Sequence, residues 1–84
     1  MKSIRLSVHA RGYRQIRGFT DAEVEDAIRT SQWLPSDLGR LECRKDFVFN
    51  ADWHRKHYAT KQVRPIFVED ATEIVVVTVY TYYF

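Results

Sequence analysis

Histidine, arginine, lysine and tyrosine are the residues of this 84-residue chain that could do chemistry on a bound ligand. The chain has three histidines, 13 lysines and arginines together, and five tyrosines, but a single cysteine, Cys43. His54 and His57 stand three residues apart with no cysteine nearby, so a zinc site is not expected. The sequence also lacks the P-loop, dinucleotide-binding, nucleophile-elbow and HExxH motifs, and no cofactor or metal is predicted.

Basic side chains with aromatic and hydroxyl side chains between them are suited to RNA. Lysine and arginine bind phosphates, aromatic rings stack on unpaired bases, and hydroxyls form hydrogen bonds. Cleavage of RNA by its own 2′-OH needs in-line positioning, a cation at the phosphate, and a proton donor and acceptor. It needs neither a metal nor a protein nucleophile, so one histidine with several arginines and tyrosines could meet these requirements. Ordinary solvated surface explains the same composition too.

The basic residues are unevenly distributed, although the formal net charge is only +2. Residues 1–18 hold five lysines and arginines and no acid, whereas residues 19–39 hold five acids against Arg29 alone. Residues 40–64 are basic again, with seven lysines and arginines against three acids. A polyanion could bind the two basic segments if they meet in space.

The last eleven residues, 74–84, form the element most able to position such a site. Each is β-branched or aromatic and none is charged, which predicts a strand. Because side chains alternate across a strand, we expect one face beneath helices and the other as a floor partly open to a ligand. The expected helix-facing residues are Val75, Val77, Val79, Thr81 and Tyr83, and the expected open-face residues are Ile74, Val76, Thr78, Tyr80, Tyr82 and Phe84. In the alternative, the tyrosines are only amphipathic rim residues.

A helix is predicted near the start of the chain. Ser7 is a typical N-cap for a helix over residues 8–17, and Gly18 would end that helix in the left-handed conformation. Helical spacing places His9, Tyr13 and Ile16 on one face, which we expect to point toward the sheet. The structural alternative for His9 is a partly buried histidine bonded to backbone.

A second helix is predicted over residues 21–29. Thr20 and Glu23 have the spacing of a capping box, in which each side chain accepts a hydrogen bond from the other residue's backbone. Phe19 lies between the two predicted helices and should pin them into a helical hairpin.

The remaining segments predict short strands and turns. An edge strand is expected over 2–6, a half-buried strand over 41–49 with its apolar face interrupted by Lys45, and a strand over 63–69 in which Pro65 implies an edge or a bulge. Turns are expected at 35–39, 50–52 and 69–73, and residues 53–61 fit either a strand or a basic loop.

These elements predict a single α+β domain over residues 1–84. It would have a short N-terminal strand, a two-helix hairpin and an antiparallel β-meander, with the helices on one face. The apolar run at the end is about half of the roughly 20 residues that a membrane-spanning helix needs. The first residues lack an apolar signal core, and one cysteine cannot form an intrachain disulfide. We therefore expect a soluble, cytoplasmic protein.

Motifs near both ends of the chain carry a family resemblance. They are Ser7-x-His9-Ala10 with Arg17-Gly18-Phe19-Thr20, Glu23-Val24, Ala27-Ile28, Ile66-Phe67-Val68-Glu69 and the run from Ile74 to Tyr80. With these motifs the chain resembles a family of small prokaryotic proteins of unassigned function that is grouped with the RelE/ParE and BrnT toxin superfamily. Residues 31–61 match only in outline, and the basic segment 53–64 is longer than the family pattern.

The resemblance implies a RelE/ParE-like fold and the toxin role of a type II toxin–antitoxin system. The implied activity is a metal-independent endoribonuclease, a hydrolase of mRNA that uses the 2′-OH, either free or on the ribosome, with a cognate antitoxin protein as partner. By the resemblance, the site is formed by His9 for proton transfer, Arg17, and Thr78 and Tyr80 at the end of the last strand. From its residue type Tyr82 is a further candidate catalytic residue, and the candidate RNA-binding residues are Arg14, Lys45, Lys61, Arg64 and Thr78. The alternative is a non-catalytic RelE/ParE-like module that inhibits or docks a protein partner.

Overall fold

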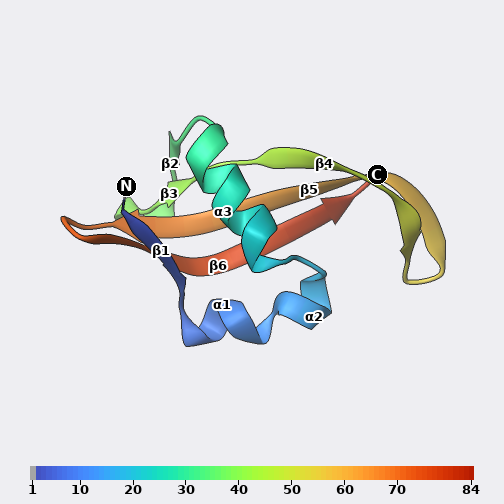
Figure 1. The fold of residues 1–84 in the computed structure, drawn as a ribbon, viewed down its shortest axis with the longest axis horizontal. Helices are drawn as coiled ribbons and strands as arrows, with labels where there is room; N and C mark the ends of the chain where they lie inside the picture. Colours follow the sequence, from blue (N-terminus) through green and yellow to red (C-terminus); the bar gives the residue numbers. More distant parts are fainter. Residues whose placement is uncertain (1) are drawn as a thin grey trace.

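A mixed sheet of six strands forms the centre of the protein in the computed structural model, which describes residues 2–84 (Figure 1). The sheet order is β1-β6-β5-β3-β2, and β4 also pairs with β5. β1 runs parallel to β6, and the other pairs are antiparallel. The expected α+β class is confirmed. The strands are β1 (Ser3–Leu6), β2 (Leu34–Pro35), β3 (Leu41–Glu42), β4 (Lys45–Trp53), β5 (Lys56–Glu69) and β6 (Glu73–Tyr83); the helices are α1 (Val8–Gly12), α2 (Arg14–Arg17) and α3 (Asp21–Thr30), with a 3₁₀ turn at Asp37–Gly39.

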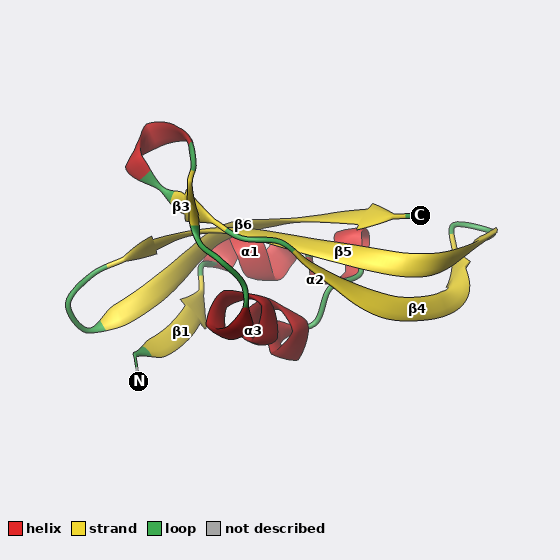
Figure 2. Cartoon of the chain, turned by 90° about the horizontal axis from the view of Figure 1, so that it is seen from above, coloured by secondary structure: helices red, strands yellow, loops and turns green. Residues whose placement is uncertain are grey.

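The two faces of the sheet differ in what covers them. Figure 2 shows α3 against one face and the 3₁₀ turn rising from the other. The core lies on the α3 side, where fully buried residues of α3 meet Val63 and Phe67 of β5. The other face is called the open face below; it carries Arg64, Ile66, Thr78, Tyr80 and Tyr82. Within residues 2–84, no helix is long and apolar enough to cross a membrane.

A β-bulge in β6 changes which of its residues face the core. Ile66 pairs with Thr78 but Phe67 pairs with Val76, so β6 has one extra residue, Val77. As a result Ile74, Val76 and Val79 are all buried, followed by half-buried Thr81 and Tyr83. The expectation of one unbroken alternation, with Val75 and Val77 beneath the helices, is wrong because the bulge shifts the phase by one residue.

The first predicted helix is divided into two. Ser7 caps α1 as predicted, since its Oγ accepts the Ala10 N–H at 3.1 Å. α1 ends at Gly12, and Tyr13 has a non-helical backbone (φ −99°, ψ 1°) before α2 begins. The prediction of one helix over residues 8–17 is therefore wrong; glycine is a poor helix former, and the break falls beside it. The predicted sheet-facing side is also wrong, because His9 and Ile16 are exposed whereas Ala10 is buried.

Gly18 and the start of α3 follow the sequence prediction. Gly18 ends α2 with φ 79°, the left-handed conformation that favours glycine. A Cβ at this position would lie 2.7 Å from the Trp53 ring and would also meet the Tyr83 hydroxyl. Thr20 Oγ1 accepts from Glu23 N at 3.1 Å and Glu23 Oε1 accepts from Thr20 N at 2.9 Å, which is the predicted capping box.

The long hairpin of β4 and β5 extends beyond the body of the domain (Figure 2). The turn expected at 50–52 is wrong: β4 continues to Trp53, with a register shift between Val48 and Ala51. The hairpin turns instead at His54 and Arg55, whose φ values are 52° and 68°. Residues 53–61, which fitted a strand or a loop, are thus the end of β4, the turn and the start of β5.

Pro65 lies in β5, which is an interior strand, so the edge alternative is wrong. The bulge alternative is confirmed, because the register of β5 with β6 shifts between Ile66 and Phe67, just after Pro65. Its carbonyl accepts from Cys43 N at 3.4 Å, at the gap between β3 and β4. The N and C=O of a strand residue point to the same side, so the missing N–H of proline falls in this gap and costs no ladder bond. Cys43 is buried, as expected for a core residue, and burial raises the pKa of its thiol to about 11.

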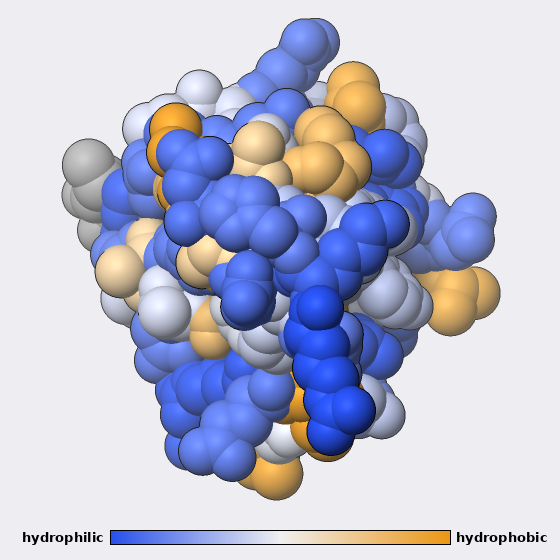
Figure 3. All heavy atoms as spheres, turned by 90° about the vertical axis from the view of Figure 1, so that its right-hand side faces the viewer, coloured by the Kyte–Doolittle hydropathy of each residue, from blue (hydrophilic) through white to orange (hydrophobic). Residues whose placement is uncertain are grey.

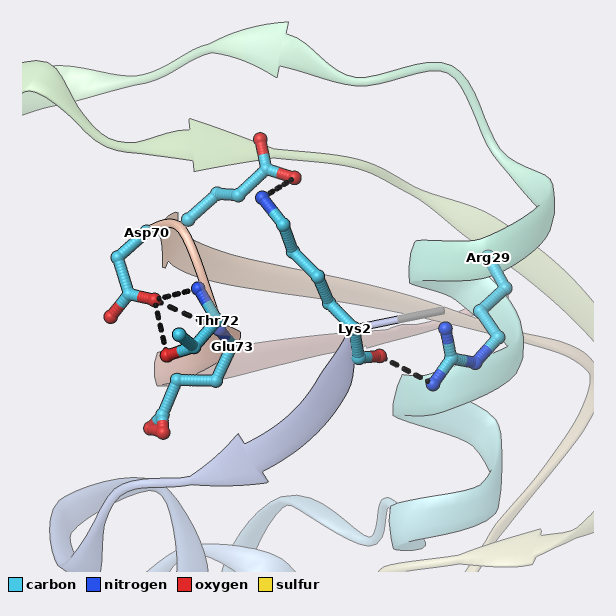
Figure 4. Close-up of polar contacts among 6 residues, drawn as sticks. Lys2, Arg29, Asp70, Thr72 and Glu73 are labelled. Atoms are coloured by element: carbon cyan, nitrogen blue, oxygen red, sulfur yellow. Dashed lines mark hydrogen bonds and ion pairs between the residues drawn. The ribbon is translucent and has the colours of Figure 1, made fainter.

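The β5–β6 hairpin is closed by a short acidic turn, as the sequence predicts (Figure 4). The Asp70 carboxylate accepts from the backbone N–H groups of Thr72 and Glu73, each at 2.8 Å. These bonds to the charged form hold the pKa of Asp70 below its ordinary value. Nearby, Lys2 Nζ pairs with Glu69 Oε2 at 3.0 Å, which fastens β1 to the same end of the sheet.

Candidate nucleic-acid interface

Arg17 reaches from the end of α2 to the edge of β6 and lies between two aromatic rings. Its guanidinium carbon is 3.9 Å from the Tyr13 ring centre and 4.8 Å from that of Tyr80. Its Nη1 donates to the carbonyl of Val79 at 2.8 Å and to Thr78 Oγ1 at 3.2 Å. These contacts fix the position of the cation and satisfy part of the β6 edge that β1 leaves unpaired.

The backbone of Arg17 is fixed by the same strand. Its carbonyl accepts hydrogen bonds from Thr81 Oγ1 at 2.6 Å and from the Tyr83 hydroxyl at 2.8 Å. Glycine at position 18 permits this close approach because the Trp53 and Tyr83 side chains occupy the space of a Cβ. The α2 end and β6 are therefore held together from both sides of Arg17.

Arg64 lies on the other side of Tyr80. The two residues are cross-strand partners, and the Arg64 guanidinium carbon is 5.4 Å from the Tyr80 ring centre. Glu42 binds this guanidinium with both oxygens, at 2.9 Å from Nε and 2.8 Å from Nη2. Arg64 Nη1 also donates to the Tyr82 hydroxyl at 3.3 Å. Mainly because of its hydrogen bonds from Arg64, the pKa of Glu42 is lowered from 4.5 to about 2.

A hollow of about 330 Å³ opens on the open face beside Tyr80. Its sheet side is formed by Arg64, Ile66, Thr78 and Tyr80, and its other side by Ser36, Asp37, Leu38 and Arg40 from the segment of the 3₁₀ turn. The sequence analysis did not identify Arg40 or Tyr13 as site residues. No short motif marks either, because a loop and a helix break set their positions.

His9 extends the same row at the α1 end. Its ring centre is 4.9 Å from that of Tyr13, and the side chain is exposed. The row thus runs His9, Tyr13, Arg17, Tyr80 and Arg64, and from Tyr13 onward tyrosine rings alternate with guanidinium groups. Five of the predicted site residues lie close together around it: Arg17, Arg64, Thr78, Tyr80 and Tyr82.

Three predicted RNA-binding residues lie elsewhere and have partners within the protein. Arg14 binds the Asp21 carboxylate through two hydrogen bonds, of 2.7 and 2.6 Å. Lys45 Nζ binds Asp26 at 3.0 Å, and Lys61 Nζ binds Glu23 at 2.8 Å. Lys61 is only 7% exposed. The Arg14 contact joins α2 to α3, and the two lysine contacts join α3 to the sheet. An RNA contact by any of the three stays a prediction.

Among the described residues, lysines and arginines without an acidic partner lie on α1, around the row and the hollow, and at the tip of the β4–β5 hairpin. Of the lysines and arginines in residues 2–84, five have no carboxylate within ion-pair distance: Arg11, Arg17, Arg40, Arg55 and Lys56. Two of these lie at the row or the hollow, and two lie at the hairpin tip. Figure 3 views the end of the molecule with this hairpin, where the surface is mostly hydrophilic with scattered hydrophobic residues. In the described part of the chain, no three His, Cys, Asp or Glu side chains are grouped so as to hold a metal ion.

Comparison with known proteins returned no relative: no family model, no curated protein and no solved structure matches this chain.

Proposed function

We propose that this chain binds RNA on its open face and cleaves it without a metal ion, as the toxin of a RelE/ParE-like toxin–antitoxin pair in the cytoplasm. The observation that carries the proposal is the Arg17 guanidinium held between Tyr13 and Tyr80, with the Arg64 guanidinium on the far side of Tyr80. Guanidinium groups bind phosphate, and aromatic rings stack on unpaired bases. A strand of RNA along the row would meet both in alternation.

The same groups fit the chemistry of cleavage by the 2′-OH. A scissile phosphate at Arg17 would have the extra negative charge of its pentacoordinate state stabilised by that guanidinium, while Arg64, beyond Tyr80, would bind the next phosphate. In this proposal Tyr80, whose ring adjoins Arg17, is the proton donor to the leaving 5′-oxygen, and His9, next to Tyr13, accepts the 2′-OH proton. Tyr82, beside Arg64, would contact the neighbouring nucleotide. The 2′-oxygen then bonds to phosphorus as the bond to the 5′-oxygen breaks, which gives a 2′,3′-cyclic phosphate and a free 5′-OH.

Glu42 has a specific part in this proposal. It neutralises Arg64 in the free protein through two short hydrogen bonds. An RNA phosphate must therefore compete with Glu42 for this guanidinium, which favours groups of strong negative charge. An antitoxin segment would also compete with Glu42 for Arg64. Such a segment would be acidic and amphipathic, so that it covers Tyr80 and Tyr82 and pairs with the arginines.

Two observations favour a second candidate, a non-catalytic module of the same fold that docks a protein partner. Arg64 is already paired, and within residues 2–84 no side chain forms a hydrogen bond that orients the His9 ring. A general base is usually held by such a bond. A docking surface needs only the cations and the rings.

Induction of the chain in cells, followed by mapping of RNA 5′ ends, separates the two candidates. The ribonuclease predicts growth arrest with new 5′-OH ends in mRNA, and Arg17→Ala should abolish both. Arg11→Ala is the matched control, because Arg11 is an exposed cation on α1 without an acidic partner. Growth arrest without new RNA ends would refute the ribonuclease and support the docking module.

A further inference from the structure

We propose that the hollow between the Ser36–Arg40 segment and the open face binds one unpaired guanine base, with Asp37 as the residue that recognises it. This inference rests on the proposed function, because RNA must lie on the open face to deliver a base. It adds a sequence preference that the row of arginines and tyrosines cannot supply. Phosphate contacts position a nucleic acid, whereas contacts to base edges read its sequence.

Asp37 is set apart from the other acids of the chain. The sequence has 11 aspartates and glutamates, and in residues 2–84 each of the other ten makes a side-chain hydrogen bond or an ion pair. Asp37, which is exposed, makes neither, and it is one of the residues that line the hollow, together with Arg40 and Arg64. Asp37 and Arg40, two groups of opposite charge without an ion-pair partner in residues 2–84, therefore border one hollow. Both are available to form hydrogen bonds with a ligand.

The segment that carries Asp37 has a fixed shape. Ser36 N donates to Arg40 O at 2.8 Å, and Arg40 N donates to Asp37 O at 3.2 Å, so the turn is closed by its own backbone. Leu38 has φ 61°, which residues other than glycine rarely adopt, and its side chain is 85% exposed. A strained position of this kind persists where the surrounding structure holds it, and such positions cluster at binding sites.

The size and walls of the hollow suit a single base. Its volume of about 330 Å³ is at the low end for sites that hold small molecules. Ile66, at the sheet side, is 6% exposed and gives an apolar surface, and the Tyr80 ring borders it. Arg40 and Arg64 can bind the phosphates on either side of an inserted nucleotide.

Guanine is the base whose edge matches a carboxylate. It presents N1–H and N2–H side by side, and the two oxygens of Asp37 can accept both at once. Adenine and cytosine place an acceptor nitrogen next to their amino group, which would face the negative charge. Uracil has one N–H between two carbonyl groups. A well-placed bidentate contact discriminates against a wrong base by about tenfold or more.

The test uses the whole chain and short fluorescent single-stranded RNAs whose 2′-OH groups are methylated, so that the probes cannot be cleaved through the 2′-oxygen. One probe is a uridine heptamer with a central guanosine, and the others have adenosine or inosine at that position. Fluorescence anisotropy at one fixed salt concentration should show about tenfold tighter binding of the guanosine probe than the adenosine probe. Inosine, which lacks the 2-amino group, should fall between them.

Asp37→Asn should remove the preference for guanosine and leave the affinity for the adenosine probe within about twofold. The matched control is Glu25→Gln on α3, which removes the same charge from the other side of the sheet and should keep the preference. Equal binding of the guanosine and adenosine probes by the unaltered chain would overturn the inference while leaving RNA binding intact, and so would an undiminished preference in Asp37→Asn. Failure to bind any probe would overturn the proposed function as well. The comparison of probes on the unaltered chain decides the question even if a variant does not fold.

Discussion

Replacement of Glu42 by glutamine should weaken the fold at neutral pH and strengthen RNA binding. The Glu42 side chain is 11% exposed and binds Arg64 through both of its oxygens. Arg44 Nε lies 3.7 Å from Glu42 Oε2 as a second ion-pair partner. This pair joins β3 to β5 across the open face. Glutamine keeps the shape of the side chain and one acceptor oxygen but removes the charge that neutralises Arg64.

The size of the stability loss follows from the pKa of Glu42. This pKa is lowered from 4.5 to about 2, and that difference corresponds to at most about 3 kcal/mol. Water at the open face screens part of this energy, and glutamine retains one hydrogen bond. We therefore expect the free energy of unfolding at pH 7 to fall by about 1–2 kcal/mol. Glu25→Gln, which breaks an exposed pair with Arg29, is the matched control and should change it by less than about 0.5 kcal/mol.

The pH dependence gives the sharper test. Because the folded-state pKa of Glu42 is depressed, its contribution is complete above the unfolded-state value of 4.5 and disappears as the pH falls toward about 2. Urea unfolding followed by circular dichroism should show the difference between the unaltered chain and Glu42→Gln shrinking across that interval. A difference that is absent at pH 7, or constant from pH 7 to pH 2, would refute the assignment of this stability to the Glu42–Arg64 pair. Weaker RNA binding by a folded Glu42→Gln variant would refute the competition between Glu42 and phosphate.

Three further substitutions test the packing at Gly18, the phosphate contact of Arg17 and the proton transfer by His9. Gly18→Ala should lower the free energy of unfolding by about 2–4 kcal/mol, because φ 79° disfavours alanine and its Cβ would collide with Trp53; a thermal melt unchanged within about 2 °C would contradict that packing. Arg17→Ala should weaken binding to all RNA sequences and reduce the slope of log K against log salt by about one, so an unchanged slope would remove Arg17 from the interface. His9→Gln should leave stability within about 0.5 kcal/mol, since His9 is exposed, yet lower RNA cleavage by about 10²-fold or more; normal cleavage would exclude it as the general base.

Features that depend on hydrogen bonds between near neighbours were predictable from the sequence. The Ser7 cap, the Thr20–Glu23 capping box, the left-handed Gly18 and the Asp70 turn all involve atoms within four residues of each other. These residue types at these spacings are typical of caps and turns, so the sequence alone predicts them correctly.

Features that depend on pairing between distant residues were not predictable in the same way. The run from Ile74 to Val79 is apolar in both phases, so no periodicity shows where the bulge at Val77 shifts the buried face. Asn50 has φ 43° within a strand, where the register with β5 shifts, and asparagine tolerates this left-handed conformation but is a typical turn residue. The actual turn uses His54 and Arg55, which are not typical turn residues.

The same distinction between local and long-range contacts applies to the residues of the candidate site. The family resemblance indicated Arg17 and Tyr80, and the β5–β6 register places Arg64 against Tyr80. Tyr13 joins the row because the first helix breaks there, and Arg40 joins the hollow because a 3₁₀ turn carries it over the open face. Both placements depend on tertiary structure, and a periodic pattern in the sequence does not report them.

The central claim is that the open face cleaves RNA through the RNA's own 2′-OH. The most direct measurement is incubation of the purified chain with a 5′-labelled single-stranded RNA in the presence of a chelator, beside the same sequence with 2′-deoxy nucleotides throughout. The account predicts cleavage of the RNA to products that end in a 2′,3′-cyclic phosphate and no cleavage of the deoxy strand. An intact RNA that is nevertheless bound, or equal cleavage of the deoxy strand, would contradict it.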